Sequence, residues 1–349
     1  MKMLRYGCVG AGAIARAKHM KGYSAFADIE FVSVCDTNEK FAQEAAQEFG
    51  FKKYYTDYRE MLEKEKLDFI SVCTPNYLHF PVTLLALENG LHVHCEKPVA
   101  LNSIEAQKMV DARNKYGKIL MIALNNRFTN HAWFVKKYTE EGLLGEIYHA
   151  RCGWKRQRGI PGKGGWFTNK ALSGGGPLID LGVHFMDLAM YFMGYPKPVS
   201  VVGATYSKFA RNECVNSSGW GMTSDKNGIM DVEDMAVGFI RLENNTTIDI
   251  EFSWASNIDQ EDNYYELLGT KGGAIYRGGE LRIITEQFST IVEIKPNLNF
   301  KCPVNEFSHF IDCVKNGTEP LSKPEEAVVL MKIIDGIYKS SQTKQEVVL

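Results

Sequence analysis

Short apolar runs that alternate with amphipathic stretches are the feature that most constrains how this chain can fold. Strand-like runs are found at residues 4–10, 31–36, 67–75, 91–97 and 118–125, and helix-like stretches at residues 14–26, 38–50, 54–65, 80–90 and 103–117. Strands that alternate with helices in this way favour an α/β domain with a parallel sheet and right-handed crossovers.

The pattern changes after residue 125, where strand-like runs dominate and turn signals at residues 243–245 and 271–273 separate several of them. This favours an antiparallel or mixed sheet. Helices are expected at residues 131–145, 178–193, 305–314 and 324–341. A length of 349 residues suggests two domains. We place them at residues 1–125 and 126–349, with a C-terminal helix that can pack back toward the first domain.

Composition argues against several classes of protein. A net charge of −2 without a basic run argues against nucleic-acid binding. The apolar runs are too short to span a bilayer, and the first residues lead directly into a strand, so no secretory leader is expected. No CxxC pair occurs, which favours free buried thiols in a reducing cytoplasm over a metal site or disulfides. The cysteines are Cys8, Cys35, Cys73, Cys95, Cys152, Cys214, Cys302 and Cys313.

A glycine turn, Gly10-x-Gly12-x-x-Ala15, directly follows the first predicted strand and opens a helix. The first glycine permits the tight turn, the second lets the backbone approach a pyrophosphate, and Ala15 allows close helix–strand packing. The helix start, with Ala13 and Ile14, would supply N–H donors to the phosphates. The turn therefore predicts dinucleotide binding, against the alternative of an ordinary strand–helix turn.

Asp36 ends the second predicted strand, 24 residues after Gly12. An acidic residue near this place hydrogen-bonds the adenosine ribose and would repel a 2′-phosphate. No arginine follows it directly. We therefore predict NAD rather than NADP as the cofactor, although Asp36 alone could also be a helix-capping residue.

Lys97 follows an apolar, strand-like run and precedes Pro98. A buried ammonium group is costly unless it is paired or used. Ligands of parallel α/β sheets bind outside the carboxyl ends of the strands. A dinucleotide held by Gly10 and Gly12 would thus place its nicotinamide in the crevice that receives Lys97, which makes this lysine a candidate active-site residue.

Asp180, His184 and Asp187 are spaced i, i+4 and i+7, on one face of a predicted helix that is otherwise apolar. Three interpretations stay open: a satisfied buried hydrogen-bond set, a metal site, or a general acid–base site in which Asp180 orients His184. His92 and His94 alternate in a strand without a third ligand at suitable spacing, so packed histidines are favoured there and no metal is predicted.

Five motifs occur in order along nearly the whole chain. They are the glycine turn, "CTPNYLH" at residues 73–79, "EKP" at 96–98, "NNRF" at 125–128 and "GGGPLIDLGVHFMD" at 174–187. By these motifs, and by the closing pattern "DGIYKSSQTKQEVVL" at residues 335–349, the chain resembles the glucose–fructose oxidoreductase/inositol dehydrogenase (Gfo/Idh/MocA) family. Together the motifs are specific, whereas any one of them alone would not be.

The resemblance implies an N-terminal Rossmann domain with a parallel sheet and a C-terminal α+β domain with a large, open, mainly antiparallel sheet. The second domain would bind substrate and mediate homodimers or homotetramers. The implied reaction is NAD-dependent hydride transfer between nicotinamide and a ring hydroxyl or ketone of a sugar, glycoside or cyclitol. Oxidation of a glycoside at C3 is one variant of it.

The resemblance also assigns roles to single residues. Lys97 and His184 would be the acid–base catalytic pair, and Asp180 would position the substrate. A cis peptide bond would precede Pro98. The residues expected near the cofactor, beyond the glycine turn and Asp36, are Thr74, Asn76, His79, Glu96, Lys97 and Asn126.

A tryptophan- and arginine-rich segment is the candidate substrate rim. Trp154, Arg156 and Arg158 alternate on a predicted strand and so share one face, and Trp166 follows. Aromatic faces pack on sugar C–H groups, and arginines hydrogen-bond hydroxyls or phosphate. A solvated basic loop with core tryptophans is an equal alternative. Arg127 of the "NNRF" motif is a further candidate substrate contact.

Two other functions stay open at this point. A related NAD-dependent glycosidase would oxidise its substrate transiently and return the hydride, without net redox change. A non-catalytic dinucleotide-binding regulator could use the same fold. The joint presence of Lys97, Asp180 and His184 argues against the regulator, because a sensor needs no catalytic trio.

Overall fold

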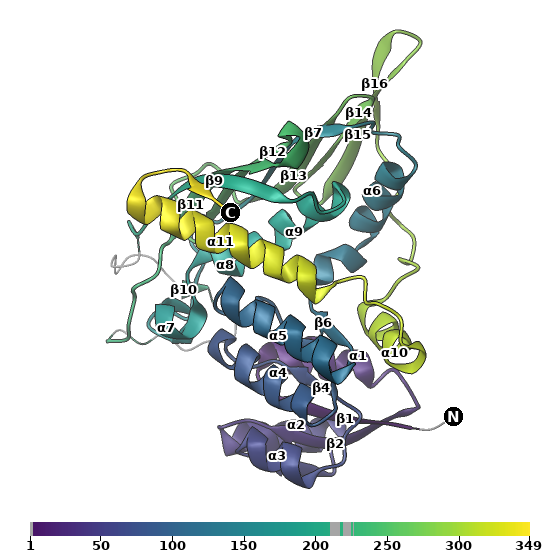
Figure 1. Ribbon diagram of the computed structural model, residues 1–349, viewed down its shortest axis with the longest axis vertical. Helices are drawn as coiled ribbons and strands as arrows, with labels where there is room; N and C mark the ends of the chain where they lie inside the picture. Colours follow the sequence, from purple (N-terminus) through teal and green to yellow (C-terminus); the bar gives the residue numbers. More distant parts are fainter. Residues whose placement is uncertain (1–2, 210–216, 219–224, 226) are drawn as a thin grey trace. The chain divides into compact units, whose positions relative to one another are not determined.

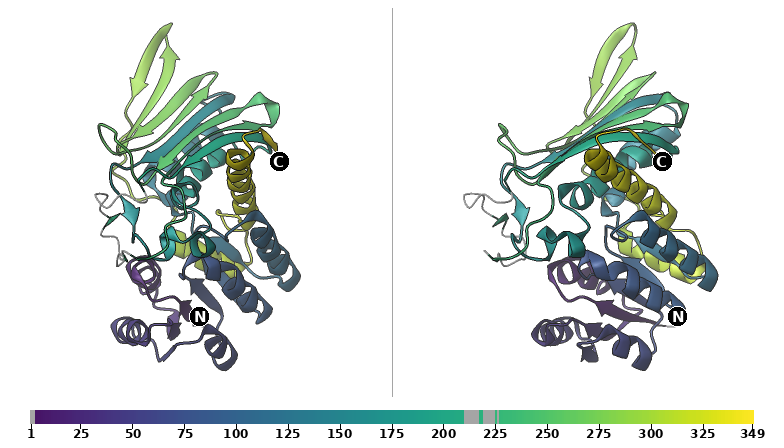
Figure 2. Two further views of the ribbon diagram at one scale, coloured as in Figure 1. Left: turned by 90° about the vertical axis from the view of Figure 1, so that its left-hand side faces the viewer. Right: turned by 60° about the vertical axis from the view of Figure 1, so that its left-hand side comes forward.

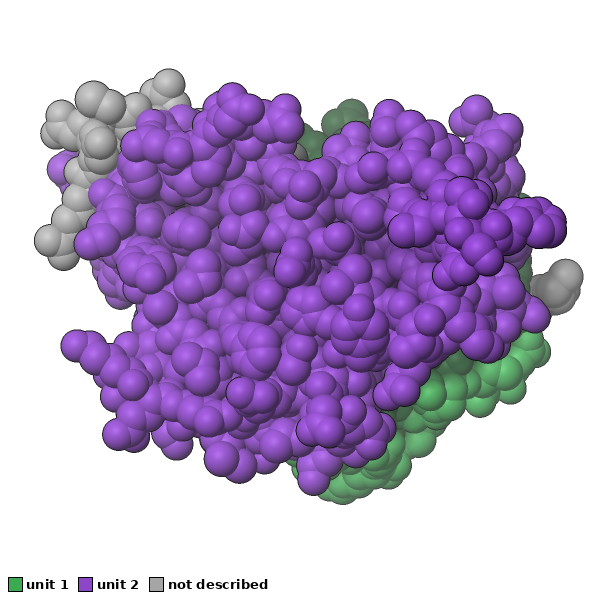
Figure 3. Space-filling view, turned by 90° about the horizontal axis from the view of Figure 1, so that it is seen from above, with its two compact units in different colours: residues 1–123, 304–328 green, residues 124–303, 329–349 purple. Residues whose placement is uncertain are grey.

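The computed structural model of the chain describes residues 3–209, 217–218, 225 and 227–349. Cys214 of the cysteine set therefore lies outside the described residues. The chain groups into two compact units, which Figure 3 colours separately. Unit 1 comprises residues 1–123 and 304–328, and unit 2 comprises residues 124–303 and 329–349.

Unit 1 is built on a six-stranded sheet in which every strand pairs in parallel with its neighbours (Figure 1). The strands are β1 (Leu4–Val9), β2 (Ile29–Cys35), β3 (Lys53–Tyr55), β4 (Phe69–Val72), β5 (His92–Cys95) and β6 (Leu120–Ile122). Their order, β3-β2-β1-β4-β5-β6, is that of the doubly wound nucleotide-binding sheet. The prediction of a Rossmann domain is confirmed.

Helices connect these strands, and local signals in the sequence fix their ends. The Asn38 side chain caps the helix after β2 by accepting from Lys40 N and Phe41 N, and Gly50 ends that helix with φ +74°. The helical segments of unit 1 are η1 (Ala15–Met20, a π-helical stretch), α1 (Lys21–Tyr23), α2 (Glu39–Phe49), α3 (Tyr58–Lys64), η2 (Asn76–Leu78), α4 (His79–Glu88), α5 (Ser103–Tyr116) and α10 (Glu306–Asn316).

Unit 2 contains a nine-stranded sheet in the order β16-β15-β14-β13-β7-β12-β11-β9-β17. Among the pairs of this sheet, only β7 and β12 run parallel. The strands are β7 (Ile147–Lys155), β9 (Pro198–Tyr206), β11 (Met235–Leu242), β12 (Thr247–Ser253), β13 (Asp262–Gly269), β14 (Gly272–Arg277), β15 (Glu280–Gln287), β16 (Thr290–Ile294) and β17 (Val347–Val348). The predicted large, mainly antiparallel sheet is confirmed. The short strands β8 (Ile160–Pro161) and β10 (Ser217–Ser218) pair separately.

Helices cover one face of this sheet, and in both views of Figure 2 the opposite face carries none from the part of the chain that is described. Buried side chains such as Phe252 and Tyr265 fill the core of unit 2. The helical segments are η3 (Asn125–Phe128), α6 (Asn130–Glu140), η4 (Trp166–Thr168), α7 (Lys170–Ser173), α8 (Pro177–Asp180), α9 (Gly182–Phe192), η5 (Glu243–Asn245) and α11 (Pro324–Thr343), which begins in unit 1.

The single helix expected over residues 178–193 is in fact two helices. It is interrupted at Leu181, where the His184 N–H bonds the carbonyl of Leu181 three residues earlier instead of continuing the α-helical pattern. Asp180 therefore ends α8, and His184 lies in the first turn of α9. None of the described helices combines the length and the apolar content needed to cross a bilayer.

Candidate active site

The glycine turn of unit 1 is shaped as the sequence predicts. Gly10 has φ +96°, and a Cβ atom at this position would lie 2.4 Å from the carbonyl oxygen of Cys73. A side chain is therefore excluded by both conformation and space. At Gly12 an added Cβ would meet nothing within 4 Å. The helix that begins with Ala13 and Ile14 thus starts beside open space, which fits a pyrophosphate group.

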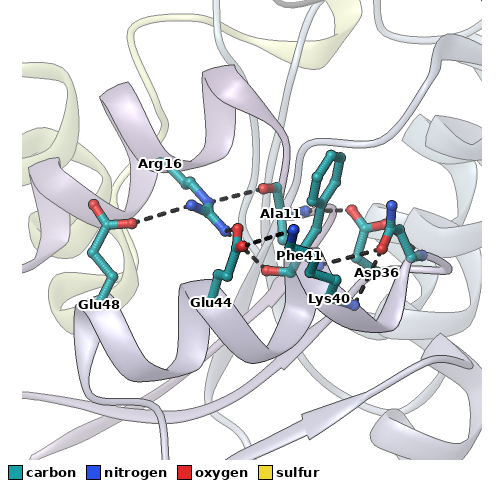
Figure 4. Close-up of polar contacts among 8 residues, drawn as sticks. Ala11, Arg16, Asp36, Lys40, Phe41, Glu44 and Glu48 are labelled. Carbon is teal, nitrogen blue, oxygen red and sulfur yellow. Dashed lines mark hydrogen bonds and ion pairs between the residues drawn. The ribbon is translucent and has the colours of Figure 1, made fainter.

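Asp36 lies at the end of β2 beside this turn (Figure 4). Its Oδ2 accepts the N–H of Ala11 at 2.8 Å, and its Oδ1 accepts the N–H of Asn38 at 2.9 Å. The carboxylate thus holds both the residue that caps α2 and the glycine turn, while its predicted contact with the ribose stays a prediction. Each carboxylate oxygen keeps further acceptor capacity for a ribose hydroxyl.

Arg16 is the arginine that approaches the turn, and acidic partners engage it (Figure 4). Its Nε donates to the Ala11 carbonyl at 3.2 Å, and one terminal nitrogen donates to the Phe41 carbonyl at 3.0 Å. Its guanidinium also lies 3.3 Å from carboxylate oxygens of both Glu44 and Glu48. This local neutralisation is consistent with a site that does not take a 2′-phosphate.

The segment after β4 supplies further groups that suit a dinucleotide. Thr74 Oγ1 is buried and has no hydrogen-bond partner among the described residues, so a ligand hydroxyl could satisfy it. Asn76 is buried nearby in sequence. His79 is buried with Nδ1 2.6 Å from the Pro98 carbonyl and Nε2 2.9 Å from the Thr74 carbonyl. Burial lowers the pKa of this histidine.

Glu96 and Lys97 follow β5. Oε2 of Glu96 accepts the Lys97 N–H at 3.1 Å, and its Oε1 lies 3.1 Å from Nε2 of His19. Burial by itself would raise the pKa of the Glu96 carboxyl, but the hydrogen bond and charge of His19 outweigh it and lower the pKa to about 2. The Lys97–Pro98 peptide bond is cis, as the resemblance implies.

Asp180 and His184 occupy the junction of α8 and α9 in unit 2. Oδ2 of Asp180 accepts the indole N–H of the buried Trp254 at 3.0 Å. The His184 ring lies 6.1 Å from the Trp154 ring. Trp254 therefore fixes the carboxylate, and Trp154 flanks the imidazole. An arrangement of this kind can position a hydroxyl group and take up its proton.

Asp187 does not join Asp180 and His184 in one polar set. It is fully buried and binds Arg127 in a two-bond ion pair, with Nε–Oδ2 at 2.8 Å and Nη2–Oδ1 at 2.5 Å. The Tyr195 hydroxyl also donates to Oδ1 at 2.5 Å. Arg127 lies over the Tyr191 ring at 4.6 Å. This guanidinium, which the sequence suggested as a substrate contact, is buried and bound by side chains of its own unit.

The remaining candidate binding residues do not form one group. The Arg156 guanidinium lies over the Trp154 ring at 4.8 Å, so these two share a face near His184. Arg158 instead donates to the Ser256 carbonyl at 3.1 Å and to Asn257 Oδ1 at 2.8 Å. The Trp166 ring stacks on Phe167 at 3.9 Å. Asn126, from the "NNRF" motif, is half-buried in η3 of unit 2.

A carboxylate that sequence reasoning missed builds the frame of α8. Glu233 is buried and accepts the N–H groups of Gly176 at 3.0 Å and Leu178 at 3.2 Å, at the start of the helix that ends with Asp180. The Tyr338 hydroxyl donates to the same carboxylate at 2.9 Å. Burial raises the pKa of Glu233 against the lowering effect of these donors.

Trp254 and His19 were also missed by sequence reasoning. No spacing rule connects either residue with the acidic residue that it contacts, because the two partners are 74 positions apart for Trp254 and 77 for His19. No local signal in the sequence could therefore have found them. Among the described residues no group of three acidic, histidine or cysteine side chains could hold a metal ion.

Comparison with known proteins agrees with this architecture. Residues 4–124 match the model of an oxidoreductase family with an NAD-binding Rossmann fold, and residues 132–275 match a GFO/IDH/MocA C-terminal domain. A D-glucoside 3-dehydrogenase of Escherichia coli is 33% identical, covering 99% of this chain and 97% of its own. A levoglucosan dehydrogenase of Pseudarthrobacter phenanthrenivorans is 28% identical over 81% of this chain and 76% of its own.

Solved structures show the same fold. A levoglucosan dehydrogenase in complex with NADH and levoglucosan superposes with a TM-score of 0.84 at 23% identity, over 99% of each chain. An oxidoreductase domain protein from Kribbella flavida reaches a TM-score of 0.87 at 20% identity, over 100% of this chain and 99% of that one. The predicted NAD-dependent dehydrogenase acting on CH–OH groups is confirmed at the level of the family. The chain belongs to the Gfo/Idh/MocA family of NAD-dependent oxidoreductases.

Proposed function

We propose that the protein oxidises a ring hydroxyl of a sugar glycoside, with the C3 hydroxyl of a glucoside as the preferred position. The observation that carries this proposal is the match to a D-glucoside 3-dehydrogenase, which is 33% identical and aligned over 99% of this chain. Free sugars and cyclitols are the related substrates to compare, since other relatives are named as levoglucosan and inositol dehydrogenases.

His184 is proposed as the proton acceptor of the substrate hydroxyl. An imidazole has an ordinary pKa near neutral pH and can accept a proton there. The Lys97 ammonium would donate a hydrogen bond to the same oxygen and stabilise its developing negative charge. Asp180, held by Trp254, would orient the hydroxyl. Bound NAD supplies the hydride acceptor.

Trp154 and Arg156 are proposed as substrate-binding groups. The guanidinium over the indole forms a flat, partly polar surface beside the His184 ring. An aromatic face suits the C–H side of a pyranose, and a guanidinium can donate to its hydroxyls. Arg127 is kept out of this set because its charge is neutralised by Asp187 inside the unit.

The test is to mix the protein with NAD and matched panels of glucosides, free sugars and inositols, and to follow reduced nicotinamide by absorbance. Many equivalents of NADH per protein with glucosides would support the proposal. Release of aglycone without NADH would show the redox-neutral glycosidase instead. NAD binding without turnover of any panel member would favour the regulator.

Two variants test the proposed roles in the same assay. Lys97→Met and His184→Asn should each lower turnover by about a hundredfold or more, the usual contribution of a positioned acid or base. Lys108→Met removes an exposed lysine of the same unit as Lys97 and should leave turnover unchanged. Full activity of the Lys97→Met variant would contradict the assignment.

Self-association through the helix-free face of the unit 2 sheet is also proposed. Strand pairing places Val202, Phe239, Asp249, Arg151 and Glu266 in one row on that face. The row borders a hollow of about 550 Å³. Arg151 lies 3.9 Å from Asp249 and 3.6 Å from Glu266, so both signs of charge occur in the same row as the exposed side chain of Val202. A two-fold interface between identical copies needs such a self-complementary surface.

Light scattering after gel filtration tests this surface. Val202→Glu should convert a dimer or tetramer into a smaller species, whereas Ile104→Glu, at an exposed apolar position of unit 1, should not. A monomeric wild-type protein would contradict the proposal.

We further propose a cytoplasmic location, because the described cysteines are all free thiols, as a reducing compartment favours.

A further inference from the structure

A column of buried polar side chains crosses the core of unit 1, and the mechanism proposed above does not use it. It links Tyr6 on β1, Ser71 on β4, His19 on η1 and Glu96 after β5. None of the four is more than 8% exposed. Polar groups at such depth cost free energy unless they are hydrogen-bonded, so an apolar core would be the simpler solution.

The contacts of the column lead to the backbone of Lys97. The Tyr6 hydroxyl donates to Ser71 Oγ at 3.0 Å, and Ser71 Oγ lies 3.0 Å from Nδ1 of His19. The other ring nitrogen of His19 lies 3.1 Å from Oε1 of Glu96. The second oxygen of Glu96 accepts the N–H of Lys97 at 3.1 Å. Each carboxylate oxygen therefore has one defined task.

The position of His19 in the chain connects its contact with Glu96 to the dinucleotide-binding turn. It belongs to the π-helical segment Ala15–Met20, which directly follows the glycine turn. A π-helical stretch often marks a functional site, because it changes which residues of a helix face a neighbour. One helix thus begins at the dinucleotide-binding turn and carries the side chain that holds Glu96.

We propose that His19 is a positioning residue of the oxidoreductase reaction, which through Glu96 fixes Lys97 relative to the helix that follows the glycine turn. This inference rests on the proposed role of Lys97. His19 itself does not touch substrate. Its effect is on the alignment of the lysine, and a displacement of about 1 Å at a reacting group can cost up to a hundredfold in rate.

The pKa values of the pair show how each partner acts on the other. Burial alone would raise the pKa of the Glu96 carboxyl, and His19 reverses this effect. In turn, Glu96 raises the pKa of His19 against the lowering effect of burial. The other titratable groups that face the pair are Lys18, Lys97, Cys8, Cys73, Cys95, Tyr6, Tyr23, His79, His94 and Glu306.

His94 provides a matched control. Its ring is fully buried, and its centroid lies 4.7 Å from that of His19. Its partners are different, since Nδ1 lies 2.8 Å from the Tyr23 hydroxyl and Nε2 lies 3.3 Å from Glu306. Replacement of His94 therefore disturbs the same part of the core without removing the direct partner of Glu96.

The experiment compares His19→Leu, His19→Gln and His94→Leu with the wild type. Leucine removes the donor to Glu96, whereas glutamine can keep one. His19→Leu should lower kcat by about tenfold to a hundredfold while KM for the sugar changes little. It should also create a new loss of kcat toward low pH, because burial then raises the pKa of Glu96. His19→Gln should recover most of kcat and remove that acidic loss.

NAD affinity, measured by calorimetry across the same pH range, supplies a readout that does not depend on turnover. His19→Leu should weaken NAD binding as the pH falls, whereas His94→Leu should follow the wild-type profile. Equal pH profiles for the two leucine variants, with only a lower Tm, would overturn the proposal and make His19 a purely structural residue.

Two further outcomes are separable. If His19→Leu does not fold, Ser71→Ala carries the test, because it removes the group that faces Nδ1 of His19 with little change in volume. A pH profile of Ser71→Ala that equals the wild-type profile would overturn the inference. A wild-type protein without turnover counts against the proposed function, whereas wild-type turnover with an unaffected His19→Leu variant counts against this inference alone.

Discussion

The buried ion pair between Arg127 and Asp187 gives the sharpest test of the structure. The exposed fraction of the side chain is 0% for Arg127 and 1% for Asp187. Replacement of Asp187 by asparagine keeps the shape of the side chain and removes its charge. The guanidinium would then lose the carboxylate that it binds through two hydrogen bonds, while the Tyr191 and Tyr195 rings would still lie against it.

The expected cost is large for a near-isosteric change. Breaking a buried pair by removing one partner typically destabilises a protein by about 3–5 kcal/mol. The cation–π contacts with the two tyrosines could offset roughly 1–2 kcal/mol of this. We therefore expect Asp187→Asn to lower the free energy of unfolding of unit 2 by about 1–4 kcal/mol.

Urea denaturation followed by tryptophan fluorescence measures this change, because the described tryptophans, Trp133, Trp154, Trp166 and Trp254, lie in unit 2. The double variant Arg127→Met with Asp187→Leu removes both charges and should recover most of the loss, because an apolar pair can replace a buried ion pair at little cost. A stability loss below about 1 kcal/mol, together with a raised KM for the sugar, would refute the reasoning. Arg127 would then be a substrate contact after all.

Three other perturbations have defined outcomes. Gly10→Ala should abolish NAD binding in calorimetry, because the new methyl group would collide with the Cys73 carbonyl at a positive φ. Glu233→Ala should cost about 2–4 kcal/mol in urea denaturation, since two N–H groups and the Tyr338 hydroxyl lose a buried charged acceptor. Asn38→Ala removes the cap of α2 and should cost about 1 kcal/mol in the same measurement.

Local signals were enough for most of unit 1. Alternating runs fixed the strands and helices, and the glycine turn fixed the start of the first helix. These features depend on side-chain period and on the conformational freedom of single residues, which a sequence displays directly. The structure contains the predicted parallel sheet, and Asp36 lies beside the glycine turn.

The candidate site of unit 2 could be predicted only in part. The spacing of Asp180, His184 and Asp187 predicted that the three side chains share one helix face, and this prediction required one continuous helix. The helix is interrupted at Leu181, so Asp180 and His184 belong to two different helices. Asp187 binds Arg127 and is therefore not part of the same polar group. Spacing describes which residues share a face of an ideal helix, and it contains no information about partners from other segments.

The sequence by itself determined the family, the NAD-binding turn, the class of each sheet and the identity of the charged candidates. Only the tertiary structure decided that residues 304–328 belong to unit 1, that Trp254 and Glu233 frame Asp180, and that His19 holds Glu96. The physical reason is the range of the interactions. Periodicity and turn preferences act between residues a few positions apart, whereas each of these contacts joins segments more than 50 residues apart and forms only when the core packs.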